Sequence, residues 1–405
     1  MITPVFLLIM LSTFAYFVSV GSLIPILPRY VEGPLDGGNV AVGVAIGAFA
    51  ITAVLLRPIA GRVSDERGRR ILIVSGGVLV GLTTLGLVVV DTLAPLIVLR
   101  VLTGIGEAFF YVGAASTIND LAPDHRRGEA LSLFSLSLYA GLAVGPVLGE
   151  LVLEGTNSFG TVWVVSAVSA LVSGVACIRV PDTRLGEAPN GGPRRVIARV
   201  ALLPGIALAT SVWGMSGFNG FVPLYALELG LDGSRVAFLI FSVVVLLLRL
   251  LGARIPDKLG HLRTARMALS VSVSGLTVIG LWQSVAGLYV GAAIFALGQA
   301  LIFPSLMSYV VSRAAPSERG SVVGTFTAFF DLAFGLGAVS LGAVSEALGY
   351  SGLFLSAAAV AGAGLAMLVR LDRRAAIGRS APPSAPPDLA AQVGTVNLQE
   401  ETWRP

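Results

Sequence analysis

Long apolar stretches, separated by short polar ones, cover almost the whole chain. Residues 71–90 and 353–369, for example, are nearly continuously apolar and lack the alternation of polar and apolar positions of a membrane β-strand. A helix that crosses a bilayer needs about 20 such residues. The pattern predicts twelve membrane-spanning helices at 4–27, 39–63, 71–90, 95–119, 128–152, 160–179, 200–225, 234–256, 264–286, 288–312, 320–345 and 351–371.

The composition points to lipid as the solvent. Only 12% of the residues are charged, 55% are hydrophobic and the mean hydropathy is +0.87, whereas a soluble protein carries about 25% charged residues. Abundant glycine, at 49 residues, favours close contact between membrane helices. Cys177 is the single cysteine, which excludes an intrachain disulfide. His125 and His261 lie in basic loops without further candidate ligands, so no metal site is expected.

The loops alternate in charge. One set carries mostly acids, whereas the other is basic, with Arg62, Arg67, Arg69, Arg70, Arg126, Arg127, Arg254, Lys258, Arg263, Arg266, Arg313 and Arg319. Basic loops stay in the cytoplasm. This predicts a multi-pass protein of the cell membrane with both termini in the cytoplasm. The first apolar stretch lacks a basic segment before it and a cleavage site after it, so we expect a retained helix and not a signal peptide.

A repeat relates the two halves of the chain at an offset of 192 residues. Leu55-Leu56-Arg57 matches Leu247-Leu248-Arg249, and Arg127-Gly128 matches Arg319-Gly320. Six helices separate equivalent positions, so both halves should have the same orientation in the membrane, as parallel repeats do. We therefore expect a six-helix bundle at 1–180, a cytoplasmic linker at 181–199, a second bundle at 200–371 and a disordered cytoplasmic tail at 372–405.

The connection between the second and third predicted helices concentrates charge at the membrane surface. It contains Gly61, Asp65, Gly68, Arg69 and Arg70. Arginine alone would serve as a positive anchor, but this spacing of glycine and aspartate suggests a cluster that holds the cytoplasmic side closed. Asp257, with Gly260 after it, is the degenerate copy in the second half.

This Gly-x-x-x-Asp-x-x-Gly-Arg-Arg spacing resembles the signature loop of the major facilitator superfamily. The resemblance extends over residues 1–371 through the twelve helices and the repeat. It implies an all-α membrane protein with twelve transmembrane helices in two parallel-repeat six-helix bundles, the major facilitator fold. It also implies a cavity between the bundles that opens alternately to the two sides.

Three charged residues inside predicted helices are candidates for proton coupling: Arg100, Glu107 and Asp331. Charged groups within a membrane are costly and mark functional sites by default. Glu107 follows Arg100 by two helical turns, on nearly the same face. The Arg-x-x-x-Gly-x-Gly stretch that begins at Arg100 resembles a helix of drug:proton antiporters whose arginine is implicated in proton coupling. A structural ion pair is the alternative for Glu107, and for Asp331 a second proton site or a partner for Arg249.

The fifth predicted helix contains Gly141, Gly145, Pro146 and Gly149. Glycines four apart form one smooth helix face, and proline bends the helix. The stretch resembles the Gly-x-x-x-Gly-Pro-x-x-Gly motif of antiporters in the same superfamily, with Glu150 where a glycine usually stands. The resemblance implies export, although close packing alone also explains the spacing.

Aromatic and polar residues on several helices are candidates for a substrate cavity: Tyr111, Tyr139, Trp213, Asn219, Gln299 and Phe303. Each could equally be a packing residue. Scattered side chains of this kind fit many ligands, so the sequence does not identify the cargo.

The leading hypothesis is a secondary transporter that exports a drug-like amphiphile or a sugar-like metabolite by proton antiport. The alternative is a proton symporter or facilitator that takes up a sugar or organic acid. In either case the protein would bind a small-molecule substrate and protons and lie in the lipid bilayer. We expect no cofactor beyond the proton gradient, no nucleic acid partner and a monomer. No catalytic arrangement supports an enzyme, and a non-transporting receptor would depend on the tail as its interaction segment.

Overall fold

The computed structural model describes residues 3–380 except 124–125, 184–197, 253–254 and 315–318. Residues 1–368 form one compact unit and residues 369–405 a second one. The description that follows concerns the first unit.

The N-terminal half of this unit is a bundle of six long helices, two of which are extended by a short 3₁₀ turn. The helices are α1 (Pro4–Glu32), α2 (Gly38–Arg67), α3 (Arg69–Gly86), α4 (Leu93–Leu121), α5 (Arg127–Thr156) and α6 (Phe159–Ala176), with η1 (Leu87–Val89) after α3 and η3 (Cys177–Arg179) after α6.

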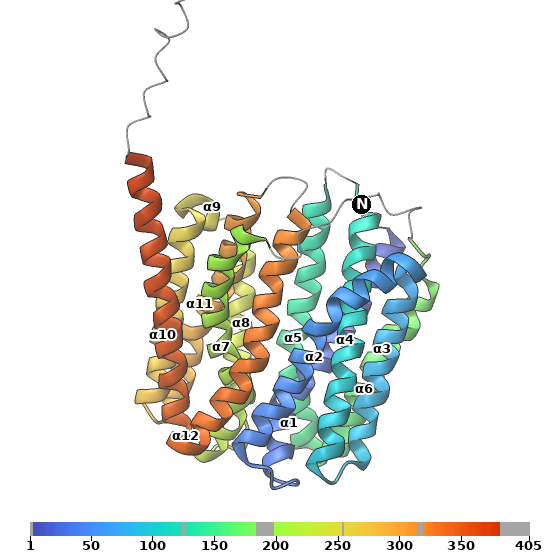
Figure 1. Cartoon of the computed structure of the whole chain (residues 1–405). Helices are drawn as coiled ribbons and strands as arrows, with labels where there is room; N and C mark the ends of the chain where they lie inside the picture. Colours follow the sequence, from blue (N-terminus) through green and yellow to red (C-terminus); the bar gives the residue numbers. More distant parts are fainter. Residues whose placement is uncertain (1–2, 124–125, 184–197, 253–254, 315–318, 381–405) are drawn as a thin grey trace, which may run out of the picture. The chain divides into compact units, whose positions relative to one another are not determined.

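The C-terminal half repeats this arrangement with an extra short helix at the α8–α10 connection. Its elements are α7 (Arg199–Glu228), α8 (Arg235–Leu251), α9 (Ile255–Leu259), α10 (His261–Leu281), α11 (Val285–Val311) and α12 (Arg319–Ser380). Helix α12 consists of two arms that meet at Gly349, where φ is 67° and ψ is −178°. Glycine reaches such a conformation without the steric cost of a Cβ atom, and the chain reverses direction there (Figure 1).

Ten of the described helices are long and apolar enough to cross a membrane. One of the ten, the stretch 321–370, contains both arms of α12. The apolar α8, with 17 residues, is not among them. Counting the arms separately and adding α8 gives the twelve predicted segments.

The helix ends differ from the prediction in informative ways. Most helices extend a turn or more beyond the apolar run, as α2 does to Arg67. The segment predicted at 264–286 is α10, which ends at Leu281, because Ser284 caps the next helix by accepting a hydrogen bond from Gly287 N at 3.1 Å. The segment predicted at 234–256 ends earlier, at Leu251.

The predicted linker and tail are described only in part. Residues 184–197 and 381–405 lie outside the described residues. The start of the predicted tail at 372 is wrong, because α12 remains helical to Ser380.

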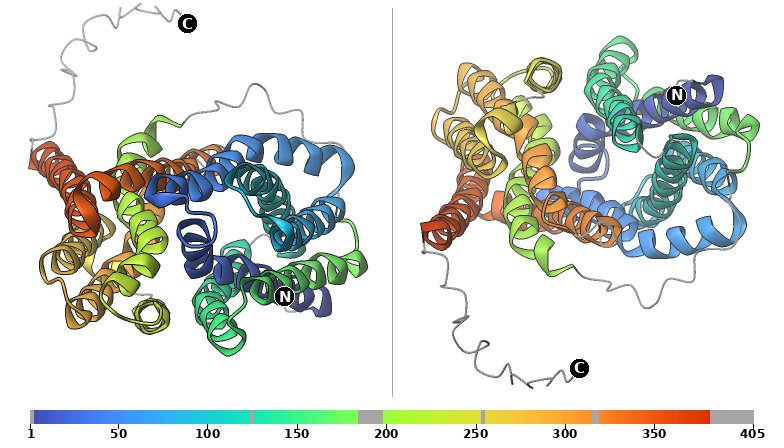
Figure 2. Two further views of the ribbon diagram at one scale, coloured as in Figure 1. Left: turned by 90° about the horizontal axis from the view of Figure 1, so that it is seen from below. Right: turned by 90° about the horizontal axis from the view of Figure 1, so that it is seen from above.

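Viewed along the helices, α1–α6 lie on one side and α7–α12 on the other (Figure 2). We call the end at which α2 joins α3 and α4 joins α5 the basic end, because it carries the basic loops. The opposite end, with the α1–α2 and α5–α6 connections, is the far end. The N-terminus lies at the basic end, at the top of Figure 1.

Glycine allows α1 and α5 to pack backbone against backbone. A Cβ atom added to Gly145 would lie 2.7 Å from the Cα atom of Gly21, and one on Gly149 would lie 2.4 Å from the carbonyl oxygen of Ser22. Gly141 approaches the Phe14 carbonyl in the same way, at 2.6 Å. The predicted helix-5 motif therefore forms a packing seam inside the N-terminal half.

Candidate functional site: a charged cavity between the two halves

A cavity lies between the two halves, with a volume of about 1340 Å³ that includes solvent at its open side. Its walls come from α1, α2, α4 and α5 of one half and from α7, α8, α11 and α12 of the other. A second lobe of about 940 Å³ shares Glu107, Met215, Asn219 and Asp331 with it. The two lobes therefore meet at two carboxylates in the middle of the membrane-spanning region.

Arg57 of α2 stands between these two carboxylates. It forms an ion pair with Asp331 on the first arm of α12, across the two halves. Its Nη2 atom also lies 3.8 Å from Oε1 of Glu107 on α4. Glu107 is buried, and its Oε2 atom has no hydrogen-bond partner within the described part of the chain. Two acids thus share one arginine, and one carboxylate oxygen remains available for a proton or a ligand.

Arg100 is placed differently from the expectation. It lines the second lobe together with Glu107, but its Nε atom donates to the carbonyl oxygen of Ala45 at 3.1 Å and its guanidinium lies 4.6 Å from the centroid of the Phe49 ring. No ion pair joins it to Glu107 among the described side chains. Arg57 is the cation at Glu107, and the sequence signals for it were its place inside the helix predicted at 39–63 and its match with Arg249 at the repeat offset.

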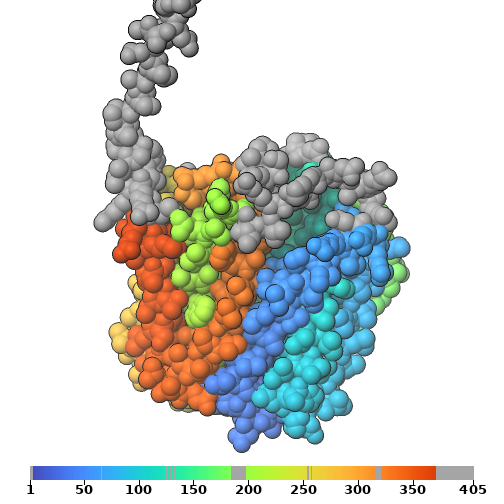
Figure 3. Space-filling model, in the orientation of Figure 1, coloured from blue at the N-terminus to red at the C-terminus, as the bar shows by residue number. Residues whose placement is uncertain are grey.

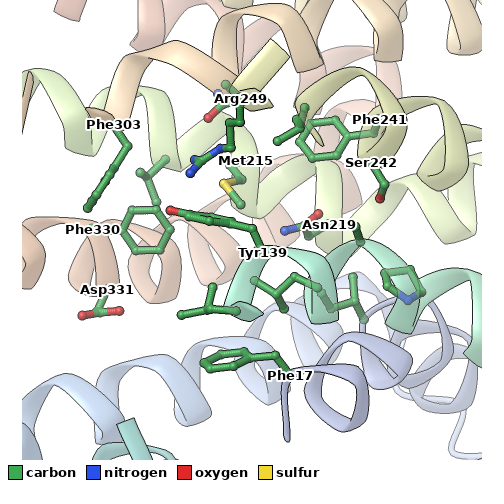
Figure 4. A pocket seen from close by; sticks show the side chains of 18 of the residues that line it. Phe17, Tyr139, Met215, Asn219, Phe241, Ser242, Arg249, Phe303, Phe330 and Asp331 are labelled. Atoms are coloured by element: carbon green, nitrogen blue, oxygen red, sulfur yellow. The ribbon is translucent and has the colours of Figure 1, made fainter. Parts of the chain in front are cut away.

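The alternative that Asp331 pairs with Arg249 is wrong, because Asp331 forms its ion pair with Arg57. The guanidinium of Arg249 on α8 lies over the ring of Tyr139 on α5, 3.5 Å from its centroid, again across the two halves. Figure 4 shows these two side chains facing each other. Arg249 and Asp331 stand 192 residues after Arg57 and Tyr139. The two contacts between halves are therefore copies of one contact, with an acid in one copy and a phenol in the other.

Five of the six predicted cavity residues line the cavity: Tyr111, Tyr139, Asn219, Gln299 and Phe303. Trp213 does not line either lobe. It packs instead against Gly337 of α12, where an added Cβ would lie 3.2 Å from the Trp213 Cα atom.

Other lining residues were not predicted, notably Met215, Phe241, Ser242 and Phe330. Phe330 lies edge-on to Phe303 with ring centroids 6.0 Å apart, and both are drawn in Figure 4. Met215, Phe241 and Phe330 are apolar and Ser242 is small, which fits any membrane helix, so no signal in the sequence separated these four from packing residues.

The predicted cluster at the α2–α3 loop makes its described contacts within the N-terminal half. Gly68 adopts φ 98° at the turn, and Arg69 pairs with Asp120 at the end of α4, with Nε and Oδ2 2.9 Å apart. The backbone N–H of Arg69 also donates to Asp182 just after α6. An added Cβ at Gly61 would meet nothing within 4 Å.

The other members of this cluster add little to the picture. Arg70 is exposed, and the side chains of Asp65 and Asp257 lie outside the described residues. Closure of the cytoplasmic side by this cluster stays a prediction.

At the far end, α5 and α8 are joined across the halves. Glu150 is fully buried and accepts hydrogen bonds from Arg29 Nη1 at 2.9 Å, Ser234 N at 3.1 Å and Ser234 Oγ at 2.6 Å. Arg235 and Glu154 form a second, half-exposed ion pair beside it. We call the contacts of Glu150 the far-end latch. They explain why a carboxylate stands next to the helix-5 motif.

Helix α2 and the first arm of α12 form a second seam at the far end. An added Cβ at Gly43 would lie 2.4 Å from the Ala338 carbonyl oxygen, and Val40 N donates to Glu346 at 3.3 Å. Figure 3 shows the two helices, in blue and orange, in direct contact on one face. The contacts between the halves at Glu154, Gly43 and Val40, and those of the latch with Ser234, all lie at this end. This structure is therefore closed at the far end.

The family model of the Major Facilitator Superfamily matches residues 9–273 and 257–403. The chain is a member of the major facilitator superfamily. An uncharacterized MFS-type transporter of Salmonella typhimurium, STM4428, is 31% identical over 374 residues, which are 90% of this chain and 95% of that protein. The MFS-type transporter YhhS of Escherichia coli K12 is 27% identical over 395 residues, 95% of this chain and 94% of YhhS.

Solved structures agree with this membership at the level of the fold. The nucleoside transporter NupG matches with a TM-score of 0.74 at 14% identity, covering 91% of this chain and all of that one. A bacterial homolog of the human lysosomal transporter Spinster matches with a TM-score of 0.79 at 14% identity, covering 92% of this chain and 98% of the homolog. The protein is a multi-pass membrane transporter of a small molecule, and not an enzyme.

Proposed function

We propose that this transporter exports a small molecule in exchange for protons, by alternating access of the cavity. The observation that carries the proposal is the ion pair between Arg57 and Asp331, which joins the two halves inside the cavity. Any rocking motion that separates α2 from the first arm of α12 has to break this pair. Its strength depends on whether Asp331 holds a proton.

One proton on Asp331 would be enough to change the balance between the two conformations. An arginine–carboxylate pair about 4 Å apart is worth about 4 kcal/mol at an effective dielectric constant of 20, and ~1.4 kcal/mol changes a population tenfold. When Asp331 is protonated, Arg57 keeps Glu107 as its partner within the N-terminal half. The proton therefore releases the contact between the halves without leaving Arg57 unpaired, and only such a difference between states can couple ion to cargo.

The cavity wall favours a drug-like amphiphile over a sugar-like metabolite. Aromatic and aliphatic side chains form most of it, with few neutral polar groups such as Asn219, Ser242 and Gln299. Gln299 already donates to Ser211 Oγ at 3.0 Å. A sugar would need a hydrogen bond for nearly every hydroxyl, because each unpaired buried hydroxyl is costly, and the apolar part of this wall would leave some of them unpaired.

Export is supported by the resemblance of the α5 motif to that of antiporters, whereas the seam that Gly141, Gly145 and Gly149 form with α1 is independent of the direction of transport. The second candidate is proton symport of an organic acid into the cell, and the observation that favours it is Arg249, a cation in the cavity without a carboxylate partner among the described side chains. Uptake of a sugar, or facilitated diffusion, has no such support from the cavity.

Purified protein in liposomes tests the proposal. An acidic lumen should drive accumulation of an amphiphile, with ethidium, 2-naphthoate and glucose as cationic, anionic and sugar probes. Asp331→Asn should abolish the effect of the gradient but leave exchange of labelled probe across the membrane, whereas Asp91→Asn, at an exposed loop acid, should behave as the wild type. Accumulation driven by an alkaline lumen, in excess of that in liposomes without the protein, would instead identify symport, and no such gradient-driven movement of any probe would refute proton coupling.

A further inference from the structure

Arg249 differs from Arg57, the other arginine of the larger lobe, in having no acidic partner among the described side chains. Arg57 contacts both Asp331 and Glu107. Among the described side chains, Arg249 forms no ion pair, its contact is the face of Tyr139, and its buried Nε atom has no hydrogen-bond partner. The guanidinium nevertheless lies on the cavity wall, as Figure 4 shows.

The charges on the wall are balanced in number but separated in space. Of the residues that line the larger lobe, Arg57, Arg249, Glu107 and Asp331 are charged. Arg57 lies with both acids, so that this group carries one net negative charge when both are ionised. Arg249 supplies the compensating positive charge on another part of the wall.

The present partner of Arg249 is weak compared with an anion. A cation–π contact is worth about 0.5–2 kcal/mol. A carboxylate accepts two parallel charge-assisted hydrogen bonds from a guanidinium, each roughly twice as strong as a neutral one. An oxyanion that reached Arg249 from the cavity would therefore gain both the charge interaction and the unused Nε–H.

We propose that Arg249 is the anion-binding subsite of the cavity, and that the cargo is an organic acid whose carboxylate pairs with this guanidinium. The apolar body of the cargo packs on Met215, Phe241, Phe303 and Phe330, which form the surrounding wall. The inference deepens the proposed function and rests on it in one respect, that the cargo occupies this cavity. It does not depend on the direction of transport or on the proton.

Two simpler roles for Arg249 make different predictions. A positive anchor at the membrane surface requires only a charge near the end of α8, and does not require a guanidinium on the cavity wall. A purely structural link between α8 and α5 would, when broken, affect all ligands alike. An anion subsite affects charged ligands alone, so a matched pair of ligands separates these roles.

Equilibrium binding to the purified full-length protein, without any gradient, tests the subsite. The probes are 2-naphthoate and its neutral isostere 2-naphthamide, followed by displacement titration and by thermal stabilisation. In the wild type the anion should bind at least tenfold more tightly than the amide. Arg249→Gln should remove this preference and leave amide binding unchanged, and Arg249→Lys should keep part of it. Arg263→Gln, at an exposed position outside the cavity, is the matched control and should bind both probes as the wild type does.

The inference is overturned if Arg249→Gln binds 2-naphthoate as the wild type does, if it weakens both probes equally, or if neither probe binds up to 1 mM. These outcomes are distinct from failure of the proposed function. If 2-naphthoate binds through Arg249 but a pH gradient moves nothing, proton coupling fails and the subsite stands. If Asp331→Asn uncouples ethidium transport while Arg249→Gln leaves anion binding intact, the subsite fails and the coupling stands.

Discussion

At the scale of single residues, the site depends on Arg57 more than on either acid. The two carboxylates come from different halves, and the arginine is the group that both can reach. Its guanidinium also lies 4.7 Å from the centroid of the Tyr111 ring. Removal of this one side chain would leave two acids inside the membrane cavity without their cationic partner, which is a costly arrangement.

This arrangement predicts strong coupling between substitutions at Arg57 and Asp331. Arg57→Gln should lower the melting temperature of the purified protein by several degrees, because Asp331 loses its partner. Asp331→Asn in the same protein should recover part of the loss, with a coupling energy on the order of 1 kcal/mol. Thermal unfolding of the wild type, the two single variants and the double variant measures this. Strictly additive shifts would show that the ion pair does not contribute to stability.

The residue scale also shows what the sequence could and could not predict. Glu107 and Asp331 were identifiable because an acid within an apolar run is costly and therefore conspicuous. Their shared partner was not, because the pairing of α2 with α12 depends on how the two halves meet. Arg100 and Trp213 were misplaced for another reason: their contacts lie within one half, and the sequence predicted the helix but not the direction of the side chain.

At the scale of helices, the close packing of α1 and α5 has its own consequence. The seam lies within one half and does not take part in the separation of the halves, so its glycines should matter for stability in every state. Close packing therefore accounts for the antiporter-type glycine spacing in the sequence. The fold itself does not show the direction of transport. The length of the apolar runs predicted the helices well. It did not predict their polar ends, which extend beyond the apolar run, as in α2.

Gly145→Ala should destabilise the protein, because the new Cβ would lie 2.7 Å from the backbone of Gly21 and α1 would have to move away. Gly155→Ala is the matched control in the same helix, since its Cβ would meet nothing within 4 Å and alanine favours the helix by about 1 kcal/mol. We expect a loss of several degrees in melting temperature for the first variant and none for the second. Equal melting temperatures for the two variants would contradict backbone contact at this seam.

At the scale of the whole transporter, the far end is closed by two seams that the repeat relates. Glu154 pairs with Arg235 where α5 meets α8, and Glu346, which stands 192 residues later, accepts a hydrogen bond from Val40 where α12 meets α2. The far-end latch at Glu150 has no such copy, because Gly342 occupies the equivalent position. The contacts of Glu154 and Glu346 join the halves at both seams. The latch adds a buried carboxylate at the α5–α8 seam only.

The latch predicts that Glu150→Gln opens the far end. The substitution removes the charged acceptor of Ser234 N and Ser234 Oγ, the contacts of the latch that cross between the halves. Hydrogen bonds to a charged group are worth about 1.5–3 kcal/mol, enough to change the ratio of closed to open states about tenfold. Spin labels on cysteines at Asp91 and Leu348, both exposed at the far end of opposite halves, would measure the opening as longer distances in a Cys177→Ser background. Glu154→Gln is the control, because its ion pair is half-exposed and such pairs contribute at most about 1 kcal/mol. If Glu150→Gln leaves the distance distribution of the wild type, or if Glu154→Gln shifts it as far, closure of the far end does not depend on the buried latch.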